Sequence, residues 1–279
     1  MKRPAPTLYT VSVADCCTNC GDRSVAADSG ALRVIHVAPG DPAAHKTIDG
    51  DASQVVGEAP RRVGNRLLSP KGTHLGYYEI NAPGAGGVGI SELNGSFYPI
   101  ESPKSAELFY VMEGSSTVLR ANGQEIPVKK GDLVFVPRGI AYGGLNFNHY
   151  RHAFILIDAG TGPLPGGPTE VTVLHPESLG KADFHVSDGR MQHDYYTGAD
   201  RSRVVVWQLA TGSGAHPAGT KTSSEPEFSI VLSGSIILTS AARTWTARAG
   251  DVYFIPRGAT VAYRASKDFR EVTVTAPVE

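Results

Sequence analysis

Short apolar runs bounded by glycine and proline are the dominant pattern along the chain. The clearest are residues 109–112, 133–136, 229–232 and 252–255, each four positions long and mostly aliphatic or aromatic. Runs of this length between turn-forming residues predict buried β-strands. We find no convincing long amphipathic helix, so the pattern predicts an all-β sandwich or barrel.

The pattern occurs twice, in copies about 120 residues apart. The first copy runs from Glu to Gly over 107–114 and resumes as Gly-Asp-Leu-Val-Phe-Val-Pro-Arg-Gly over 131–139. The second copy covers 227–234 and resumes as Gly-Asp-Val-Tyr-Phe-Ile-Pro-Arg-Gly over 250–258. This offset makes each copy the size of a domain rather than of a solenoid repeat.

A hairpin is predicted between the two halves of the first copy. Residues 117–119 and 125–128 are the expected strands, and Asn122-Gly123 between them suits a type I′ turn. The second copy is one residue shorter and has an Ala-Ala pair at 241–242 instead.

The repeated spacing resembles the two motifs of the cupin superfamily, G-x5-H-x-H-x3,4-E-x6-G and G-x5-P-x-G-x2-H-x3-N. The chain keeps E-x6-G and G-D-x4-P-x-G in both copies, over roughly residues 70–158 and 190–276, and so is similar to a bicupin. The chain is most similar to the subgroup with ethanolamine-utilisation-type cupins and ureidoglycine aminohydrolase, and the segments 195–201 and 204–207 add to that similarity. The resemblance implies an all-β fold of two tandem cupin barrels, each a double-stranded β-helix or jelly roll.

Four segments are expected on this basis. They are an N-terminal extension (1–65), a first barrel (66–158), a Pro/Gly-rich linker with lead-in (159–189) and a second barrel (190–279). The extension contains a strand-like run at 32–37, and we expect it to close a sheet edge.

The metal ligands that the resemblance implies are mostly missing. A metal-binding cupin uses the two His and the Glu of the first motif and the His of the second. Glu107 and Glu227 match the Glu, but Tyr142 and Val261 stand at the second-motif His, and the stretches preceding both Glu residues contain no His. Because one carboxylate is not a metal site, we expect neither a metal nor another cofactor. A relocated metal site using His149, His152 or His216 is the alternative.

The first barrel offers the better candidate chemistry. Glu107 is expected to point into the barrel, where desolvation raises the pKa of a carboxyl group and makes it a general acid or base near neutral pH. Tyr142 is its expected catalytic partner, and Asn146, Tyr98 and Tyr110 are expected to bind ligand. The alternative is that Glu107 only satisfies a neighbouring hydroxyl in the barrel interior.

The second barrel is expected to be the poorer one. Its ligand-binding candidates are Glu227 and Trp207, but Val261 and Ala265 replace the second-motif His and Asn. Packing of the core explains Trp207 equally well.

Composition and charge limit the kinds of partner that we expect the chain to bind. The formal net charge of −1 argues against nucleic acid, whose phosphates need a basic surplus. Neither a signal peptide nor a spanning segment is evident, so we expect a cytoplasmic protein without a membrane partner. Cys16, Cys17 and Cys20 form an odd, local cluster that fits a reducing compartment and reads either as a weak C-x-x-C metal or redox signal or as a turn.

Three functions remain open. One is a metal-independent hydrolase, lyase or isomerase acting through Glu107 on a small polar metabolite. Another is a non-catalytic small-molecule-binding or sensing protein, and the third is a metalloenzyme with displaced ligands. Whether the chain is an enzyme is left open by the sequence, and we take the first function as the working prediction. The resemblance also implies a homodimer.

Overall fold

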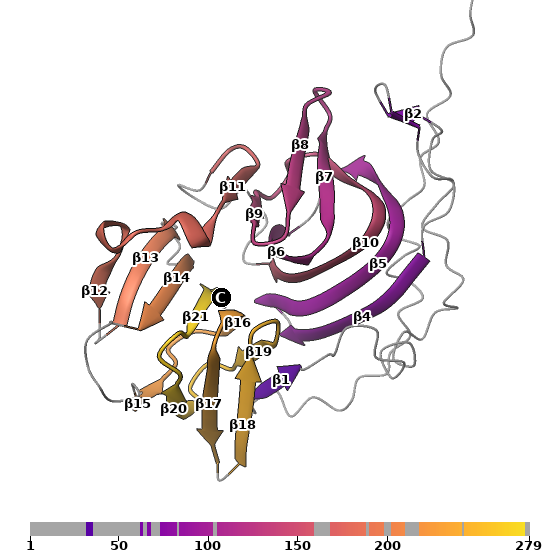
Figure 1. Cartoon of the computed structure of the whole chain (residues 1–279). Helices are drawn as coiled ribbons and strands as arrows, with labels where there is room; N and C mark the ends of the chain where they lie inside the picture. Colours follow the sequence, from indigo (N-terminus) through magenta and orange to yellow (C-terminus); the bar gives the residue numbers. More distant parts are fainter. Residues whose placement is uncertain are drawn as a thin grey trace, which may run out of the picture.

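The computed structural model shows an almost entirely β-stranded chain, which confirms the predicted all-β class (Figure 1). Within the described residues there is no α-helix, and two 3-10 helices, η2 (Pro176–Ser178) and η3 (Lys181–Asp183), join the halves. In the part of the chain that the structure describes, no helix is long and apolar enough to cross a membrane. The structure describes residues 32–35, 62–63, 66–67, 73–82, 84–102, 105–158, 168–187, 190–197, 202–209, 218–241 and 243–276.

The N-terminal barrel is built on one long, bent sheet with the order β11-β9-β6-β10-β5-β4, to which β7 and β8 are added. The first part of β10 pairs with β7 and its last part pairs with β6, so this strand contributes to both walls. Its strands are β4 (Thr73–Ala82), β5 (Gly86–Glu101), β6 (Ala106–Glu113), β7 (Ser115–Arg120), β8 (Glu125–Lys129), β9 (Leu133–Val136), β10 (Tyr142–Ile157) and β11 (Thr172–Leu174).

The C-terminal barrel has two sheets, with the orders β1-β19-β16-β21-β14-β13-β12 and β15-β20-β17-β18. A separate pair, β2 (Arg62–Val63) and β3 (Arg66–Leu67), belongs to neither barrel. The strands of the C-terminal barrel are β1 (Arg33–Ile35), β12 (His185–Ser187), β13 (Arg190–Thr197), β14 (Arg203–Leu209), β15 (Ala218–Thr222), β16 (Glu227–Ser233), β17 (Ser235–Ser240), β18 (Arg243–Arg248), β19 (Val252–Ile255), β20 (Thr260–Ala265) and β21 (Arg270–Thr275).

The sequence repeat is also a repeat of strand pairing. β6 pairs with β9 and β10 just as β16 pairs with β19 and β21, and β7 pairs with β8 as β17 does with β18. The register is kept as well, because Glu107 lies opposite Val136 and Glu227 lies opposite Ile255. The four strands predicted from the apolar runs are therefore confirmed.

Outer strands cover the corresponding edge in each barrel. β11 pairs with β9, and β1 pairs with β19 at the matching edge of the C-terminal barrel. The expectation that the extension closes a sheet edge is confirmed for Arg33–Ile35, and the edge belongs to the barrel that is more distant in sequence. Leu32 of the 32–37 run is buried, with 3% of its surface exposed, and residues 36 and 37 lie outside the described residues.

The predicted type I′ turn at Asn122-Gly123 is wrong. A type I′ turn needs positive φ at both central residues, and only Gly123 has it, at 85°. The loop between β7 and β8 is four residues long, and Gly123 N donates to Arg120 O across it. In the shorter hairpin of the C-terminal barrel the positive φ of 47° falls on Ala241, a residue type that seldom adopts it.

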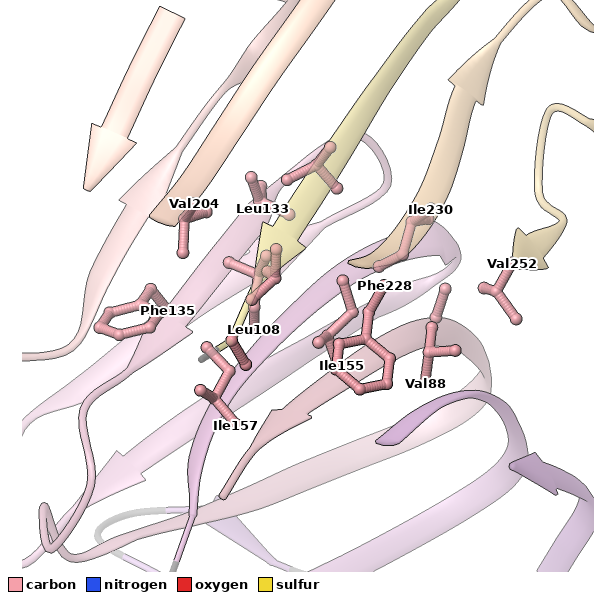
Figure 2. Close-up of a cluster of buried hydrophobic side chains, with 14 of the residues drawn as sticks. Val88, Leu108, Leu133, Phe135, Ile155, Ile157, Val204, Phe228, Ile230 and Val252 are labelled. Carbon is pink, nitrogen blue, oxygen red and sulfur yellow. The ribbon is translucent and has the colours of Figure 1, made fainter. Parts of the chain in front are cut away.

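Apolar side chains form three cores, and alternation along the strands assigns each side chain to one of them. On β16, Phe228 and Ile230 belong to a central core between the barrels, whereas Val231 lies inside the C-terminal barrel. Figure 2 shows Phe228 and Ile230 near Val88 and Ile155 of the other barrel. The two barrels are thus packed through the outer faces of their large sheets, while their interiors remain separate.

Candidate functional site

Glu107 faces the interior of the N-terminal barrel. On β6 it alternates with Leu108, which belongs to the central core, and it shares its face with Phe109 of the barrel interior. The hydroxyl of Tyr142, at the start of β10, donates a hydrogen bond to Glu107 Oε2. Both side chains are half-buried, so the pair lies where the interior begins to meet solvent.

Burial raises the pKa of the Glu107 carboxyl above its ordinary value, and the hydrogen bond from Tyr142 opposes that rise. A raised carboxyl pKa shifts the titration toward neutral pH, which is the direction that suits a general acid or base. The pair therefore combines a carboxyl group able to take or give a proton with a phenol able to donate a hydrogen bond.

The other predicted residues of this barrel are placed differently. Asn146 lies further along β10 and is buried, with 3% of its surface exposed. Tyr98 lies in β5 opposite Gly144 of β10, and its side chain is outside the described part. Tyr110 is on the opposite face of β6 from Glu107 and packs against the central core, so it does not join the Glu107–Tyr142 pair.

The nearby histidines have other partners. His152 lies inside the barrel among aromatic rings, with its ring centroid 5.7 Å from that of Phe109 and 5.0 Å from that of Tyr150. It is opposite Val111, four positions along β6 from Glu107, which corresponds to roughly 13 Å. His149 Nε2 is 2.6 Å from Glu92 Oε1. Neither histidine is assembled with Glu107 and Tyr142, and His216 lies outside the described residues.

Glu227 takes the equivalent place in the C-terminal barrel but is held by a cation. Lys221 Nζ donates to Glu227 Oε2, and the Ser223 hydroxyl donates to Oε1. Alternation along β15 points Lys221 inward, and 23% of its side chain is exposed. Glu227 is buried, with 8% of its surface exposed.

This arrangement does not fit the metal that the cupin resemblance implies. The Glu227 carboxylate is already paired with an ammonium group, which would repel a divalent ion at the same oxygens. In the part of the chain that the structure describes, no three His, Cys, Asp or Glu side chains are arranged to hold a metal ion. Cys16, Cys17 and Cys20 lie outside that part.

A second carboxylate lies deeper in the C-terminal barrel. Glu271 on β21 is fully buried, accepts a hydrogen bond from the Tyr253 hydroxyl at Oε2 and one of 2.9 Å from Thr273 Oγ1 at Oε1. Burial raises the pKa of Glu271 to about 7, although the nearby charges of Lys221 and Arg190 lower it.

Hydroxyl and indole groups extend this network. Trp207 Nε1 donates to Thr273 Oγ1 over 3.1 Å, and Ser229 Oγ is 3.0 Å from the same oxygen. Trp207, a predicted ligand-binding residue, is 4% exposed, so its indole forms part of the wall. On its ring rests the guanidinium of Arg190, whose Cζ is 4.6 Å from the Trp207 centroid and also 4.6 Å from that of Tyr263.

The expectation that the C-terminal barrel is poorer in polar groups is therefore wrong. The family motifs do not include Arg190, Tyr253 or Glu271, so a residue-by-residue transfer of motif positions misses all three. A usable signal was the strand Arg-Glu-Val-Thr-Val-Thr at 270–275, where charged and hydroxyl residues alternate with valine. Such alternation gives one face of the strand to a polar environment and the other to a core.

Comparison with known proteins agrees with this architecture. Residues 94–158 match the family model described as "Cupin domain". The fold is accordingly an all-β jelly-roll barrel of the cupin type. A search of curated proteins found no match.

Solved structures share the fold over most of the chain. A salicylate 1,2-dioxygenase from Pseudaminobacter salicylatoxidans aligns with a TM-score of 0.61 at 16% identity, over 93% of this chain and 88% of that one. A putative glyoxylate-induced protein from Pseudomonas aeruginosa aligns with a TM-score of 0.57 at 19% identity, over 75% and 80%. Protein Ylba from E. coli gives 0.54 at 14% identity, over 78% and 96%. At these identities the likeness concerns the fold.

Proposed function

We propose that the chain is a bicupin whose N-terminal barrel carries out metal-independent acid–base chemistry on a small polar metabolite at Glu107 and Tyr142. The observation that carries the proposal is the hydrogen bond from Tyr142 to the half-buried Glu107, whose pKa is raised by burial. The repeated strand pairing of the two halves supports the bicupin arrangement, and the sequence resemblance supports placement near the ethanolamine-utilisation-type and ureidoglycine aminohydrolase subgroup.

The chemistry follows from the two groups. An ionised Glu107 accepts a proton from a bound substrate, and a protonated Glu107 returns one to a leaving group or to a neighbouring carbon. The Tyr142 hydroxyl donates a hydrogen bond to whichever oxygen carries negative charge, the Glu107 carboxylate or an oxyanion of the substrate. These steps suit a hydrolase, lyase or isomerase, and the fold itself admits many chemistries.

The test is a panel of small hydroxy, keto and amide metabolites incubated with the protein in D2O and followed by proton NMR. This readout detects hydrolysis, elimination, isomerisation and exchange of carbon-bound protons in one experiment. We expect wild-type protein to convert at least one panel member and Glu107→Gln to lose the reaction. Tyr142→Phe should slow it about 100-fold or more, as general acid–base partners typically do.

The matched control is Glu113→Gln, which changes an exposed glutamate at the opposite end of β6 from Glu107. It should keep full activity. A reaction that survives both Glu107→Gln and Tyr142→Phe contradicts the proposal. Binding of a panel member without any turnover contradicts it too, and favours a binding or sensing protein instead.

A further inference from the structure

Two cationic side chains face the interior of the C-terminal barrel from different strands. Lys221 points inward from β15, and Arg190 at the start of β13 reaches over the ring of Trp207, a residue of the barrel core. The Tyr263 ring that contacts Arg190 lies opposite Gly219, which shares a face of β15 with Lys221, and both cations also lower the pKa of the buried Glu271. They therefore converge on one region of the barrel interior.

Two aromatic rings hold the Arg190 guanidinium group so that its N–H groups are available to bind a ligand. Its guanidinium lies between the Trp207 and Tyr263 rings, a placement that stabilises a cation through both ring faces and leaves the in-plane N–H groups to bind. A hydrogen bond with Tyr263 accounts for part of the guanidinium. Its Nε is buried and has no hydrogen-bond partner among the described residues. A buried N–H without a partner is costly, so this donor is suited to an acceptor supplied from outside.

Gly219 is what allows Tyr263 to take this position. A Cβ at residue 219 would lie 2.7 Å from the Tyr263 hydroxyl oxygen and 2.9 Å from Cζ, closer than such atoms approach. Gly219 and Tyr263 are directly opposite each other on β15 and β20. The ring that covers Arg190 therefore depends on the missing side chain at this position.

Lys221 is the accessible cation of the pair. Part of its side chain is exposed, and its Nζ contacts Glu227. An ammonium group has three donors, so contact with one carboxylate oxygen leaves capacity for a second anion. Val261 lies opposite Lys221 in register and is fully buried, which gives the site an apolar wall.

We propose that the C-terminal barrel binds a small organic carboxylate between Lys221 and Arg190, with Glu227 as the internal counter-ion that the ligand carboxylate partly replaces. The aromatic rings of Trp207 and Tyr263 and the side chain of Val261 would contact the short apolar body of the ligand. This site is separate from Glu107 and Tyr142, so it stands or falls independently of the function proposed for the N-terminal barrel.

Tryptophan fluorescence provides a direct readout, because the chain has two tryptophans, Trp207 and Trp245. In a Trp245→Phe background, the emission reports on Trp207 beneath Arg190. Acetate, pyruvate and oxalate are titrated as probes against sodium chloride at equal ionic strength. We expect at least one of the three carboxylates to change the emission in a saturable way at millimolar concentration.

Substitutions then assign the site. Lys221→Met and Arg190→Met should each weaken binding about tenfold or more, because each removes one charged partner of the carboxylate. Glu227→Gln should strengthen it, since the ammonium group is no longer shared with an internal carboxylate. Arg248→Met, which removes an exposed cation at the other end of β18 from the row of strand pairs that contains Lys221, is the matched control and should leave the titration unchanged.

Two further variants distinguish a loss of binding from a loss of folding. A thermal melt of every variant shows whether it is folded. Lys221→Arg keeps the charge and should retain binding, whereas Gly219→Ala keeps both cations but displaces the Tyr263 ring and should weaken binding. The proposal is overturned if the emission follows ionic strength alone. It is equally overturned if folded Lys221→Met and Arg190→Met bind the probe as tightly as Arg248→Met does.

Discussion

The two barrels share a scaffold and differ in what fills it. Phe109 and Phe154 lie opposite each other inside the N-terminal barrel, and the residues at the same register in the C-terminal barrel are Ser229 and Thr273. One pair is an apolar contact of the core, and the other pair is hydrogen-bonded over 3.0 Å. Identical strand pairing therefore does not dictate the polarity of the interior.

The two barrels also differ two residues earlier in the sequence, at His152 on β10 and Glu271 on β21. His152 of the N-terminal barrel lies among aromatic rings, whereas Glu271 at the matching place is bonded to Tyr253. In the N-terminal barrel the hydrogen-bonded pair of Glu107 and Tyr142 is half-buried. In the C-terminal barrel the polar groups form a buried network, which is why we propose proton transfer for the first barrel and carboxylate binding for the second.

The largest expected effect is on the free energy of unfolding, when Phe154 and Thr273 are each replaced by alanine. Phe154→Ala should lower the free energy of unfolding by about 3–5 kcal/mol, because it leaves a cavity in a packed apolar core. Thr273→Ala should cost about 1–3 kcal/mol, the range for leaving buried hydrogen-bonding groups unpaired. Urea denaturation measures both. Equal losses would show that the two interiors are held together in the same way.

The next effect is a pH dependence from Glu271. Its pKa is raised to about 7 in the folded protein, so between its unfolded value near 4.5 and pH 7 the folded state holds a proton that the unfolded state releases. The unfolding free energy should therefore fall as pH rises through this window, by on the order of 3 kcal/mol from this group, and level off above it.

Comparing wild-type protein with Glu271→Gln isolates that contribution. The Gln side chain does not titrate, so the variant should be similar to wild type near pH 4.5 and more stable than wild type near pH 8. Denaturation curves at several pH values give the difference. Parallel stability profiles for the two proteins would contradict a titrating Glu271.

A smaller change is expected at Glu107. The Tyr142 hydrogen bond lowers the pKa of this carboxyl, so Tyr142→Phe should raise it further. Carbon-13 NMR of labelled glutamate side chains follows the titration. Tyr195→Phe removes a hydroxyl that contacts Thr172 rather than Glu107, and it should leave the Glu107 titration where it is.

The smallest expected effect is on stability, from substitutions at the tips of the two corresponding hairpins. Ala241→Gly should stabilise the protein by about 1 kcal/mol, because glycine adopts the positive φ of 47° without the strain that alanine incurs. Gly123→Ala should destabilise it by a similar amount, since nothing lies within 4 Å of the added Cβ and only the φ of 85° opposes it. Thermal melts resolve both signs, and a stabilising Gly123→Ala would contradict the turn geometry.

Much of the fold was predictable because its signals are local. The apolar runs and the Gly-Asp and Pro-x-Gly elements identify the strands and their repetition without any knowledge of distant contacts. The hairpin turn was assigned wrongly, because a four-residue loop admits a turn in which Asn122 keeps a negative φ.

The site was only half predictable. Motif spacing identified Glu107, Tyr142 and Glu227. Alternation would have excluded Tyr110, since three positions along a strand reverse the face. The convergence of Arg190, Lys221 and Glu271 depends on three strands meeting across the barrel, and no spacing in a single sequence encodes that meeting.

The pairing of β1 with β19 has a consequence for synthesis of the chain. β1 is made before either barrel exists, and its partner forms near the opposite end of the described residues. Until β19 has been synthesised, β1 has no strand to pair with. After the C-terminal barrel has formed, the edge of its sheet at β19 remains unpaired until β1 binds to it. Since closing so long a loop is slow, this docking is expected to be a late event in folding. Removal of residues 1–35 should then leave nascent C-terminal barrels prone to join each other edge to edge.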